Sequence, residues 1–375
     1  MKIAINCAFF QPKGGGIKEY IHNLVENLDK IDEENEYVIY VLKDYFEYAK
    51  NGLNTRFRIK SLPFKGKGLF NTIIRSSFEQ FYWSKEEKKE KWDIFHSPFF
   101  HGPTLKSAKL ILTVHDLRFF RYPETYPFLR YQFLRRAVKK SINKADKIIS
   151  ISQFTKNEII EAYHIPEDRI RVIHEAINPN HFSKSNLSPY DEMKIKDLKD
   201  VPFLLSVGHL EPRKNYERLI DAFGIVKRNL SFNPKLVIIG KKGHDFTNTI
   251  HKIQQDKDII YLNFVSQELL NWLYENTSLF VFPSIYEGFG FPPLEAGMHG
   301  SISAVSAVSS MPEVCGDAVL YFDPFKIDSI GDVLIKALSD ESIKSSLSGK
   351  MKKQLLGFSW KKNAEETLDT YKSIL

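Results

Sequence analysis

Short apolar runs rich in β-branched residues recur along this chain, and each is followed by turn residues and then by a pattern of helical period. Strands that alternate with helices in this way predict parallel sheets covered by helices on both faces. The fold class that we expect is therefore α/β. The predicted strands are Lys2–Cys7, Tyr37–Leu42, Ile94–His96, Leu110–Val114, Lys147–Ile151, Phe203–Val207, Lys235–Gly240, Ile259–Leu262, Leu279–Phe282 and Val319–Phe322.

The alternation restarts near residue 201, after a polar stretch rich in Asn, Ser and Pro. A chain of 375 residues is too long for one ordinary hydrophobic core, and a stretch of this composition is typical of a linker. We therefore expect one doubly wound domain over residues 1–180, a linker over 181–200 and a second such domain over 201–357. Open parallel sheets bind ligands beyond the carboxyl ends of their strands, so two such domains facing each other predict a site in a central cleft.

The composition is that of a basic globular protein, with a formal net charge of +7 and an isoelectric point near 9.0. This charge is compatible with nucleic acid, an anionic membrane surface or phosphorylated substrates as partners. No long uncharged apolar run predicts a transmembrane helix, and the short apolar start is expected to be a buried strand and not a signal peptide. Cys7 and Cys315 show no disulfide or metal spacing, so a reducing cytoplasm is the simplest location.

The strongest functional pattern is residues 281–295, Val-Phe-Pro-Ser-Ile-Tyr-Glu-Gly-Phe-Gly-Phe-Pro-Pro-Leu-Glu. It predicts a strand, a glycine loop and a helix with Pro292 and Pro293 in its first turn, where an N–H has no helical partner. The free N–H groups and the dipole at such a helix start favour phosphate, whereas Glu287 and Glu295 are suited to accept hydrogen bonds from hydroxyl groups. Phosphate donors beside hydroxyl acceptors predict a nucleotide sugar. The alternative is a surface helix with a capping acid.

A second segment, residues 206–215, reads Ser-Val-Gly-His-Leu-Glu-Pro-Arg-Lys-Asn and follows another predicted strand. Its turn places Arg213 and Lys214 at the strand end, where a guanidinium fork and a point charge can bind phosphate oxygens. Fixed cations there would stabilise the charge that builds up on a leaving nucleoside diphosphate. The alternative is a pair of surface cations near a helix start.

The first half of the chain holds weaker candidates. His115 follows a predicted strand and can hydrogen-bond a sugar hydroxyl, while Asp116 can orient it, accept from another hydroxyl or cap the next helix. Gly15 and Gly16 let the backbone approach a ligand at a helix start, or make a tight turn. Ser152 can cap a helix or face a ligand.

Together these segments resemble the retaining glycosyltransferases of group 1, family 4. Glu287 and Glu295 have the E-x7-E spacing of that family, in the setting F-P-S-x-Y-E-G-F-G-F-P-P-L-E-A, and residues 208–215 are similar to its G-x-x-x-x-x-K-N signature. The resemblance implies a GT-B fold, in which two Rossmann-like domains face a central cleft. It also implies that the N-terminal domain lies on the acceptor side, that the C-terminal domain binds the donor, and that residues 358–375 form a helix crossing back to the N-terminal domain.

The resemblance further implies roles for individual residues. Glu287 would contact the donor sugar, Glu295 the ribose and His115 a sugar hydroxyl, while Arg213 and Lys214 would bind the diphosphate. The implied catalytic residues are Glu287, His115, Arg213 and Lys214. The implied donor-binding residues are Gly15, Gly16, Gly208, Arg213, Lys214, Glu287, Gly288, Phe289, Gly290, Phe291 and Glu295, and Asp116 and Ser152 are candidates on the acceptor side. No Asp-x-Asp motif lies in a suitable loop, so we expect no required metal and no cofactor.

The implied reaction transfers a hexose, with retention at the anomeric carbon, from a GDP- or UDP-linked sugar to a hydroxyl of a glycan. The acceptor would be a lipid-linked or growing surface glycan, such as a lipopolysaccharide O-antigen or a capsule. Residues 281–295 are similar in form to those of mannosyltransferases of O-antigen assembly, so mannose is the first sugar that we expect. Two alternatives remain open: a UDP-sugar 2-epimerase of the same fold, and a non-catalytic nucleotide-sugar-binding subunit of a glycan assembly complex.

Two stretches, residues 64–92 and 117–140, combine cations with aromatic residues. This combination fits peripheral contact with an anionic membrane surface, such as the inner face of the cell membrane, where a lipid-linked acceptor is held. The alternative is a solvated face whose aromatic side chains turn inward. No motif supports nucleic acid as a partner.

Overall fold

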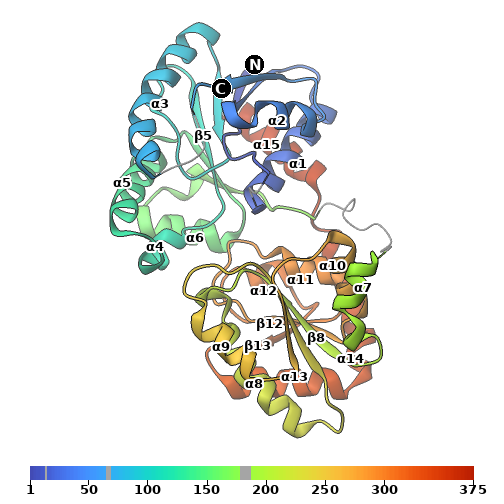
Figure 1. Cartoon of the computed structure of the whole chain (residues 1–375). Helices are drawn as coiled ribbons and strands as arrows, with labels where there is room; N and C mark the ends of the chain where they lie inside the picture. Colours follow the sequence, from blue (N-terminus) through green and yellow to red (C-terminus); the bar gives the residue numbers. More distant parts are fainter. Residues whose placement is uncertain (13–14, 65–68, 178–186) are drawn as a thin grey trace. The chain divides into compact units, whose positions relative to one another are not determined.

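The computed structural model describes residues 1–12, 15–64, 69–177 and 187–375, with only the backbone described over residues 69–78. The chain divides into two compact units (Figure 1). The first contains Met1–Ala176 and Ser359–Leu375, and the second contains Ile177–Phe358. The chain therefore passes from one unit to the other twice.

The first unit is built on a parallel sheet whose described strands follow the order β3-β2-β1-β4-β5-β6-β7. The strands are β1 (Lys2–Asn6), β2 (Glu36–Leu42), β3 (Arg58–Leu62), β4 (Ile94–Ser97), β5 (Lys109–Val114), β6 (Lys147–Ser150) and β7 (Ile170–Val172). β1 pairs with β2 on one side and with β4 on the other. Because the strand order reverses at β1, the boundary between β1 and β4 is a topological switch point, where open α/β sheets bind ligands.

The second unit repeats this plan with the strand order β10-β9-β8-β11-β12-β13. Its strands are β8 (Phe203–Val207), β9 (Lys235–Ile239), β10 (Ile259–Leu262), β11 (Leu279–Phe282), β12 (Ser303–Ser306) and β13 (Leu320–Phe322). Every pairing is parallel. The switch point of this sheet lies between β8 and β11.

Helices connect the strands in both units (Figure 1). Those of the first unit are α1 (Gly15–Ile31), α2 (Phe46–Gly52), α3 (Leu69–Glu90), α4 (Arg118–Arg121), α5 (Phe128–Lys144), α6 (Gln153–Tyr163) and α15 (Trp360–Lys372). Those of the second unit are α7 (Pro189–Lys194), α8 (Tyr216–Asn229), α9 (Thr247–Gln255), α10 (Gln267–Asn276), α11 (Phe291–Met298), α12 (Met311–Cys315), α13 (Ile327–Ser339) and α14 (Glu341–Leu355).

Both faces of the first sheet are covered. On one face Phe95 of β4 packs with Trp83 of α3, at 4.8 Å between ring centroids, and with Ile142 of α5. On the other face Tyr20 of α1 shares a 3.1 Å hydrogen bond with Thr113 of β5. Successive residues of a strand point to opposite faces, which explains why these buried strands read as continuous apolar runs.

The last helix, α15, belongs to the first unit although it follows the whole second unit in sequence. It begins after Ser359, whose side chain accepts a hydrogen bond from the N–H of Lys362. The Tyr371 hydroxyl lies 2.7 Å from Nδ1 of His96, and Nε2 of His96 lies 2.8 Å from Oγ1 of Thr113. Tyr371 and His96 are fully buried, and burial lowers the pKa of His96 to about 3. α15 therefore completes a polar network inside the first unit.

The second sheet is also covered on both faces. Phe203 of β8 stacks on Trp272 of α10, with ring centroids 6.3 Å apart. The next residue, Leu204, points to the opposite face of the sheet, where it lies in a core cluster with Phe223 of α8 and Leu334 of α13. The two sheets are therefore the two Rossmann-like domains expected from the sequence. Both contain the strand order 3-2-1-4-5-6 that is typical of this fold, and β7 extends the first sheet by one strand.

The apolar pattern does not predict the two edge strands of the first sheet, β3 and β7. β3 has the polar sequence Arg-Ile-Lys-Ser-Leu, and β7 has only three residues. An edge strand pairs on one side only, so it can be short and carry charged residues. The inner strands that were predicted lie within one or two residues of their expected bounds, but β12, with the sequence Ser-Ala-Val-Ser, is an inner strand that was not predicted.

The segment expected to be a linker, residues 181–200, contains a helix in its described part. α7 begins with Pro189 after Ser188, whose hydroxyl accepts a hydrogen bond from the N–H of Asp191. This is a complete N-terminal capping arrangement within a stretch whose composition predicts a linker. α7 belongs to the second unit.

In the charge run at the end of α3, Glu87 and Glu90 are buried and make structural contacts, whereas Lys88, Lys89 and Lys91 are exposed. Glu87 accepts hydrogen bonds from the backbone N–H groups of Ser107 and Ala108 at 2.8 and 2.9 Å. Glu90 lies 2.5 Å from the cations of both Arg58 and Lys60. The nearby indole rings of residues 83 and 92 are buried. For these aromatic residues the inward-turned alternative is confirmed.

Candidate functional site

The turn after β8 and the loop after β11 meet at the switch point of the second sheet. Gly208 follows β8 directly, and Glu287 lies five residues beyond the end of β11. The backbone N–H of Ile285 donates a 2.8 Å hydrogen bond to the carbonyl of Arg213, which joins the two segments. This is the edge of the sheet at which doubly wound folds bind ligands.

Glu287 is the centre of a compact charged cluster. Its Oε1 lies 2.5 Å from Nζ of Lys214, 2.9 Å from Nη1 of Arg213 and 2.6 Å from Oγ of Ser284. Burial alone would raise the pKa of Glu287, but the two cations and the Ser284 hydroxyl outweigh it and lower the pKa to about 2. Oε2 has no hydrogen-bond or ion-pair partner among the described residues, so one carboxylate oxygen is held and the other is open.

The cluster contains a second carboxylate, Glu211, whose Oε1 lies 3.0 Å from Nη2 of Arg213. Two cations and two carboxylates make the formal charge of the cluster zero. Nη1 of Arg213 also donates to the carbonyl of Tyr286 at 3.0 Å, and Nζ of Lys214 lies 4.8 Å from the centre of the Phe282 ring. Arg213 and Lys214 are thus held in place by several contacts each, as a preorganised cation site requires.

The loop before α11 is shaped by close backbone packing. Gly290 has φ +100°, and a Cβ there would lie 2.1 Å from Cε of Met311. The single hydroxyl proton of Ser310 is shared between the carbonyl oxygens of Glu287 and Phe289, which lie 3.0 and 2.7 Å from Oγ. The left-handed conformation favours glycine at residue 290, and a side chain there would also require the flexible end of Met311 to move.

Glu295 lies in the second turn of α11. The buried hydroxyl of Tyr274 donates a 2.9 Å hydrogen bond to Oε2 of Glu295. Burial, together with the Glu295 carboxylate, raises the pKa of Tyr274 well above its usual value, so the hydroxyl stays protonated and remains a donor. This contact fixes the direction of the Glu295 carboxylate.

In the first unit, His115 lies one residue beyond β5 and is oriented by a carboxylate from another strand end. Its Nδ1 lies 3.0 Å from Oε1 of the buried Glu175, which follows β7. Its Nε2 lies 3.3 Å from the carbonyl of Pro98, and its ring packs edge-on against Tyr20 at 4.9 Å. The carboxylate that orients His115 is therefore Glu175 and not the adjacent Asp116.

Two family models match this chain. The model of Glycosyltransferase Family 4 matches residues 14–181, and that of glycosyl transferases group 1 matches residues 191–354. The O-antigen chain mannosyltransferase B of Escherichia coli is 30% identical over 293 residues, which make up 77% of this chain and 76% of that protein. The chain belongs to the group 1 glycosyltransferases. The family expected from residues 206–215 and 281–295 is thereby confirmed.

A second relative of this glycosyltransferase, the serotype-specific mannosyltransferase WbdA of Escherichia coli, is 31% identical over 277 residues. The match covers 71% of this chain but 34% of WbdA, so the chain spans about a third of that relative.

Solved structures show the same fold. WaaG, a glycosyltransferase involved in lipopolysaccharide biosynthesis, has a TM-score of 0.72 at 17% identity, over 98% of this chain and 99% of its own. HepE of Anabaena, solved with UDP and glucose, also has a TM-score of 0.72, at 15% identity, over the whole of both chains. The GT-B fold class is confirmed.

The remaining predicted residues of this glycosyltransferase have mainly structural contacts. Oδ1 of Asp116 accepts a 3.0 Å hydrogen bond from the N–H of Arg118 at the start of α4. Ser152 is buried and caps α6 by accepting from the N–H of Thr155. For Ser152 the capping alternative describes the observed contact, whereas Asp116 precedes Leu117, the N-cap residue of α4, and makes a local contact two residues along the chain.

The glycines and aromatic residues of the expected donor site take different positions. Gly15 and Gly16 are exposed at the start of α1, and Gly15 has φ +59°. Phe289 is buried, with its ring centroid 5.3 Å from that of the half-buried Phe291. Gly288 is also buried, within the loop before α11. Lys13 and Gly14, which precede Gly15 in the sequence, lie outside the described residues.

The structure adds a glycine that the sequence pattern does not single out. A Cβ at Gly240, which follows β9, would lie 1.9 Å from the carbonyl oxygen of Gly208. A Cβ at Gly208 would in turn lie 3.1 Å from Cε of Lys214. These glycines let the turns after β8 and β9 approach each other and leave room for Lys214. The only signal in the sequence is the position of Gly240 at the end of an apolar run.

Among the described residues, no group of three or more His, Cys, Asp or Glu side chains could hold a metal ion. None of the described helices combines the length and the apolar composition that a membrane crossing requires.

Proposed function

We propose that this chain is a retaining hexosyltransferase that moves a sugar, first of all mannose, from a nucleotide diphosphate sugar to a hydroxyl of a growing surface glycan. The observation that carries the proposal is the cluster of Glu287, Arg213 and Lys214 at the switch point of the second sheet. It combines two fixed cations, suited to a diphosphate, with a carboxylate that has one open oxygen, suited to a sugar hydroxyl.

In the proposed reaction the bond between the anomeric carbon and the diphosphate oxygen breaks, and a bond from that carbon to the acceptor oxygen forms. The acceptor proton passes to the leaving phosphate oxygen on the same face of the sugar, which gives retention. Arg213 and Lys214 would stabilise the charge on the leaving diphosphate, an interaction stronger in the transition state than in the ground state. No metal or cofactor is part of this proposal.

The remaining roles follow from contacts in each unit. Oε2 of Glu287 would accept from a hydroxyl of the donor sugar, and Glu295, directed by Tyr274, would accept from the ribose hydroxyls. His115, held by Glu175, would contact a sugar hydroxyl.

Mannose and a surface glycan are supported by the relatives. The E. coli O-antigen chain mannosyltransferase B is 30% identical to this chain, and the O-antigen chain mannosyltransferase RfbU of Salmonella typhimurium is 29% identical over 57% of it. A GDP-linked donor is therefore the first to test, and a UDP-linked donor, as in the HepE structure with UDP and glucose, is the second.

A surface at the start of α5 supports peripheral contact with an anionic membrane. Phe128 and Leu129 expose 71% and 69% of their surface, and Arg130 and Arg135 are exposed on the same helix. Apolar side chains beside cations are the combination that binds anionic interfaces. Co-sedimentation with anionic but not with neutral vesicles, lost in a variant with Phe128→Ser and Leu129→Ser, would support this contact.

The proposed function is tested by thermal-shift measurements with GDP-, UDP- and dTDP-sugars, followed by transfer assays with the sugar that binds. A bound nucleotide sugar raises the apparent melting temperature by mass action. Nuclear magnetic resonance of the product should show the anomeric configuration of the donor. Absence of any shift would contradict the proposal, and release of free UDP without an acceptor would favour a 2-epimerase. Nucleotide-sugar binding without any turnover would favour a non-catalytic subunit.

A further inference from the structure

The loop after β12 supports the loop that contains Glu287. β12 is paired in parallel with β11, so the loops that follow these two strands leave the same edge of the sheet next to each other. Oγ of Ser309 accepts a 3.3 Å hydrogen bond from the N–H of Glu287, and Oγ of Ser310 lies 3.0 Å from the carbonyl oxygen of the same residue. Both backbone polar groups of Glu287 are therefore bound to hydroxyl groups of one neighbouring loop.

A third serine holds the side chain of Glu287. Oγ of Ser284 lies 2.6 Å from Oε1 of Glu287, whereas Oε2 has no partner among the described residues. The loop itself contains Gly288 and Gly290, and glycine has more backbone freedom than any other residue. Contacts from outside the loop are therefore needed to keep the carboxylate of Glu287 in one direction.

Ser309 makes its contact in an unfavourable backbone conformation. Its φ is +56°, in the left-handed region, which a residue with a Cβ adopts only at a cost in free energy. Glycine would avoid this cost, but it has no hydroxyl to accept from the N–H of Glu287. A strained serine at a position that suits glycine indicates that the hydroxyl has a use, and strain of this kind gathers at functional sites.

The supporting loop is itself anchored to the sheet. The hydroxyl oxygen of Tyr321, on β13, lies 2.6 Å from the carbonyl oxygen of Gly316 and 3.3 Å from that of Met311. The N–H of Val314 donates a 2.9 Å hydrogen bond to the carbonyl of Ser310. Ser310 is fully buried. The two serines are thus presented to Glu287 by a fixed segment, as a preorganised site requires.

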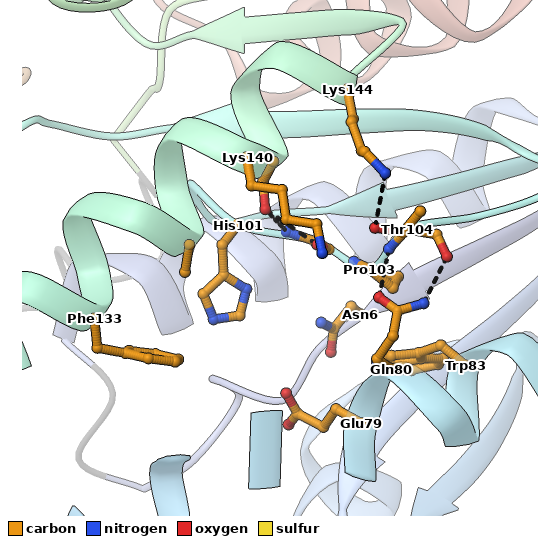
Figure 2. A pocket seen from close by; sticks show the side chains of 13 residues that line it. Asn6, Glu79, Gln80, Trp83, His101, Pro103, Thr104, Phe133, Lys140 and Lys144 are labelled. Atoms are coloured by element: carbon orange, nitrogen blue, oxygen red, sulfur yellow. Dashed lines mark hydrogen bonds between the residues drawn. The ribbon is translucent and has the colours of Figure 1, made fainter. Parts of the chain in front are cut away.

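The first unit holds the loop after β4 in a comparable way. Figure 2 shows the amide of Gln80, on α3, bound twice to the backbone of Thr104, with both distances 2.7 Å, beside a cavity of about 420 Å³. The hydroxyl of Ser141, on α5, lies 3.2 Å from the backbone nitrogen of Gly102 and 3.1 Å from its carbonyl oxygen. Neutral side chains from outside the loop fix its backbone in both units, so Gln80 offers a control for the role of Ser309.

We propose that Ser309 and Ser310 are positioning residues for sugar transfer, an assignment that rests on the proposed glycosyltransferase function. They act through Glu287, because fixing its backbone keeps Oε2 directed at the donor sugar. A misplacement of about 1 Å in a group that orients the reacting molecule can lower the rate about a hundredfold.

Two variants separate the hydroxyl of Ser309 from its backbone strain. Ser309→Ala removes the hydroxyl and keeps the strain, whereas Ser309→Gly removes both. The melting temperature of Ser309→Gly should therefore exceed that of Ser309→Ala by roughly 2–4 °C. Both variants should nevertheless lower kcat/KM for the nucleotide sugar to a similar extent, about threefold to tenfold, as expected when one hydrogen bond is lost.

GDP-mannose is the first donor for these assays, and GDP is the probe of binding without the sugar. The dissociation constant of GDP should stay within about twofold of wild type in both variants of Ser309, because the roles proposed for the diphosphate and the ribose belong to other residues. If transfer follows the melting temperature, so that Ser309→Gly is as active as the wild type, the role of Ser309 is only structural and the proposal is overturned.

Hydrogen–deuterium exchange on the whole chain tests the support without turnover. Peptides that cover residues 284–291 should exchange faster in Ser309→Ala and Ser309→Gly than in the wild type, because the N–H of Glu287 loses its acceptor. Unchanged exchange in both variants would overturn the proposal. Faster exchange in a chain that transfers no sugar from any donor would contradict the proposed function, while the contact between Ser309 and Glu287 would be confirmed.

Two control variants remove a similar contact elsewhere. The hydroxyl of Ser306, a buried residue of β12, donates to the carbonyl of Phe282 at 3.2 Å and does not contact Glu287. Ser306→Ala should leave kcat/KM and the exchange of residues 284–291 unchanged. Gln80→Ala, in the first unit, should leave this exchange unchanged as well. Equally fast exchange in the Ser306 and Ser309 variants would indicate general loosening of the second unit and overturn the proposal.

Discussion

Nζ of Lys214 lies 2.5 Å from Oε1 of Glu287, although the two residues are 73 positions apart in the sequence. The contact joins the turn after β8 to the loop after β11, the two segments on either side of the switch point. Each side chain therefore helps to hold the other in place. A substitution of Glu287 removes the carboxylate and also changes how the two cations are held.

Removal of the Glu287 side chain should destabilise the second unit and abolish transfer. Glu287→Ala leaves the buried Lys214 without its carboxylate, which typically costs about 3–5 kcal/mol, whereas Arg213 keeps its ion pair with Glu211. Glu287→Gln keeps the size and one acceptor, so it should destabilise less while still lowering kcat. Calorimetric unfolding and transfer rates measure the two effects. A Glu287→Ala protein with wild-type melting and wild-type transfer would contradict both the structural and the functional role.

The low pKa of Glu287 predicts loss of stability in acid. A carboxyl group whose pKa is lowered on folding contributes stability that is present above its unfolded pKa and is lost as the pH falls through its folded pKa. For Glu287 the window extends from about 4.5 down to about 2, and the contribution is at most about 3 kcal/mol. The free energy of unfolding, measured between these pH values, should depend less steeply on pH in Glu287→Gln than in the wild type. An equally steep dependence would show that other carboxylates dominate.

Gly290→Ala should distort the loop before α11. The new Cβ would meet Cε of Met311 at 2.1 Å, in a backbone conformation with φ +100°. Gly300→Ala is a matched control, because Gly300 also has a positive φ, +81°, but a Cβ there meets nothing within 4 Å. Both variants should lose roughly 1–3 kcal/mol from backbone strain, and only Gly290→Ala should also lose nucleotide-sugar binding. Melting temperatures measured with and without the nucleotide sugar separate the two effects. An equal increase on adding the nucleotide sugar in both variants would contradict the role of the loop.

Tyr274→Phe should weaken nucleotide binding through Glu295. The change removes the 2.9 Å hydrogen bond to Oε2 of Glu295, and a bond to a charged group contributes about 1.5–3 kcal/mol. Tyr261→Phe is the control, since that hydroxyl donates to the carbonyl of Gly240 and has no contact with Glu295. The dissociation constant of the nucleoside diphosphate should rise in the first variant only. A rise of the same size in both would indicate a general loss of stability.

Glu175→Gln should lower kcat by changing how His115 is held. Loss of a hydrogen bond to a charged group, about 1.5–3 kcal/mol, corresponds to roughly a tenfold to hundredfold effect. Nucleotide binding by the second unit should not change, because Glu175 and His115 belong to the first unit. If His115→Ala and the double variant have the same kcat as Glu175→Gln, the two residues act together. Full activity of Glu175→Gln would show that the contact has no part in transfer.

The fold could be predicted from the sequence where burial is complete. Inner strands such as β8 and β11 are covered on both faces and read as continuous apolar runs. β3 and β7 are edge strands, and their polar or very short sequences carry no such pattern.

The candidate site was predictable as a set of residues but not as a set of contacts. Arg213, Lys214 and Glu287 follow predicted strands, so their place at one sheet edge could be expected. Their ion pairs depend on β8 lying next to β11, a neighbour relationship that no local pattern encodes. Glu175 was missed for a related reason, because it follows the three-residue strand β7 that the pattern does not show. The capping contact of Ser152, which is local, was among the alternatives drawn from the sequence.

The place of α15 in the first unit has a consequence for how the protein is made. Ribosomes synthesise the chain from its N-terminus, and domains that are made early can fold before synthesis ends. The first unit cannot do so completely, because Tyr371, the partner of His96, emerges only after the whole second unit. Until then its sheet lacks a helix on one face. A C-terminal truncation would therefore damage the half of the protein that is encoded first. In nascent chains the first unit should become resistant to proteolysis later than the second unit.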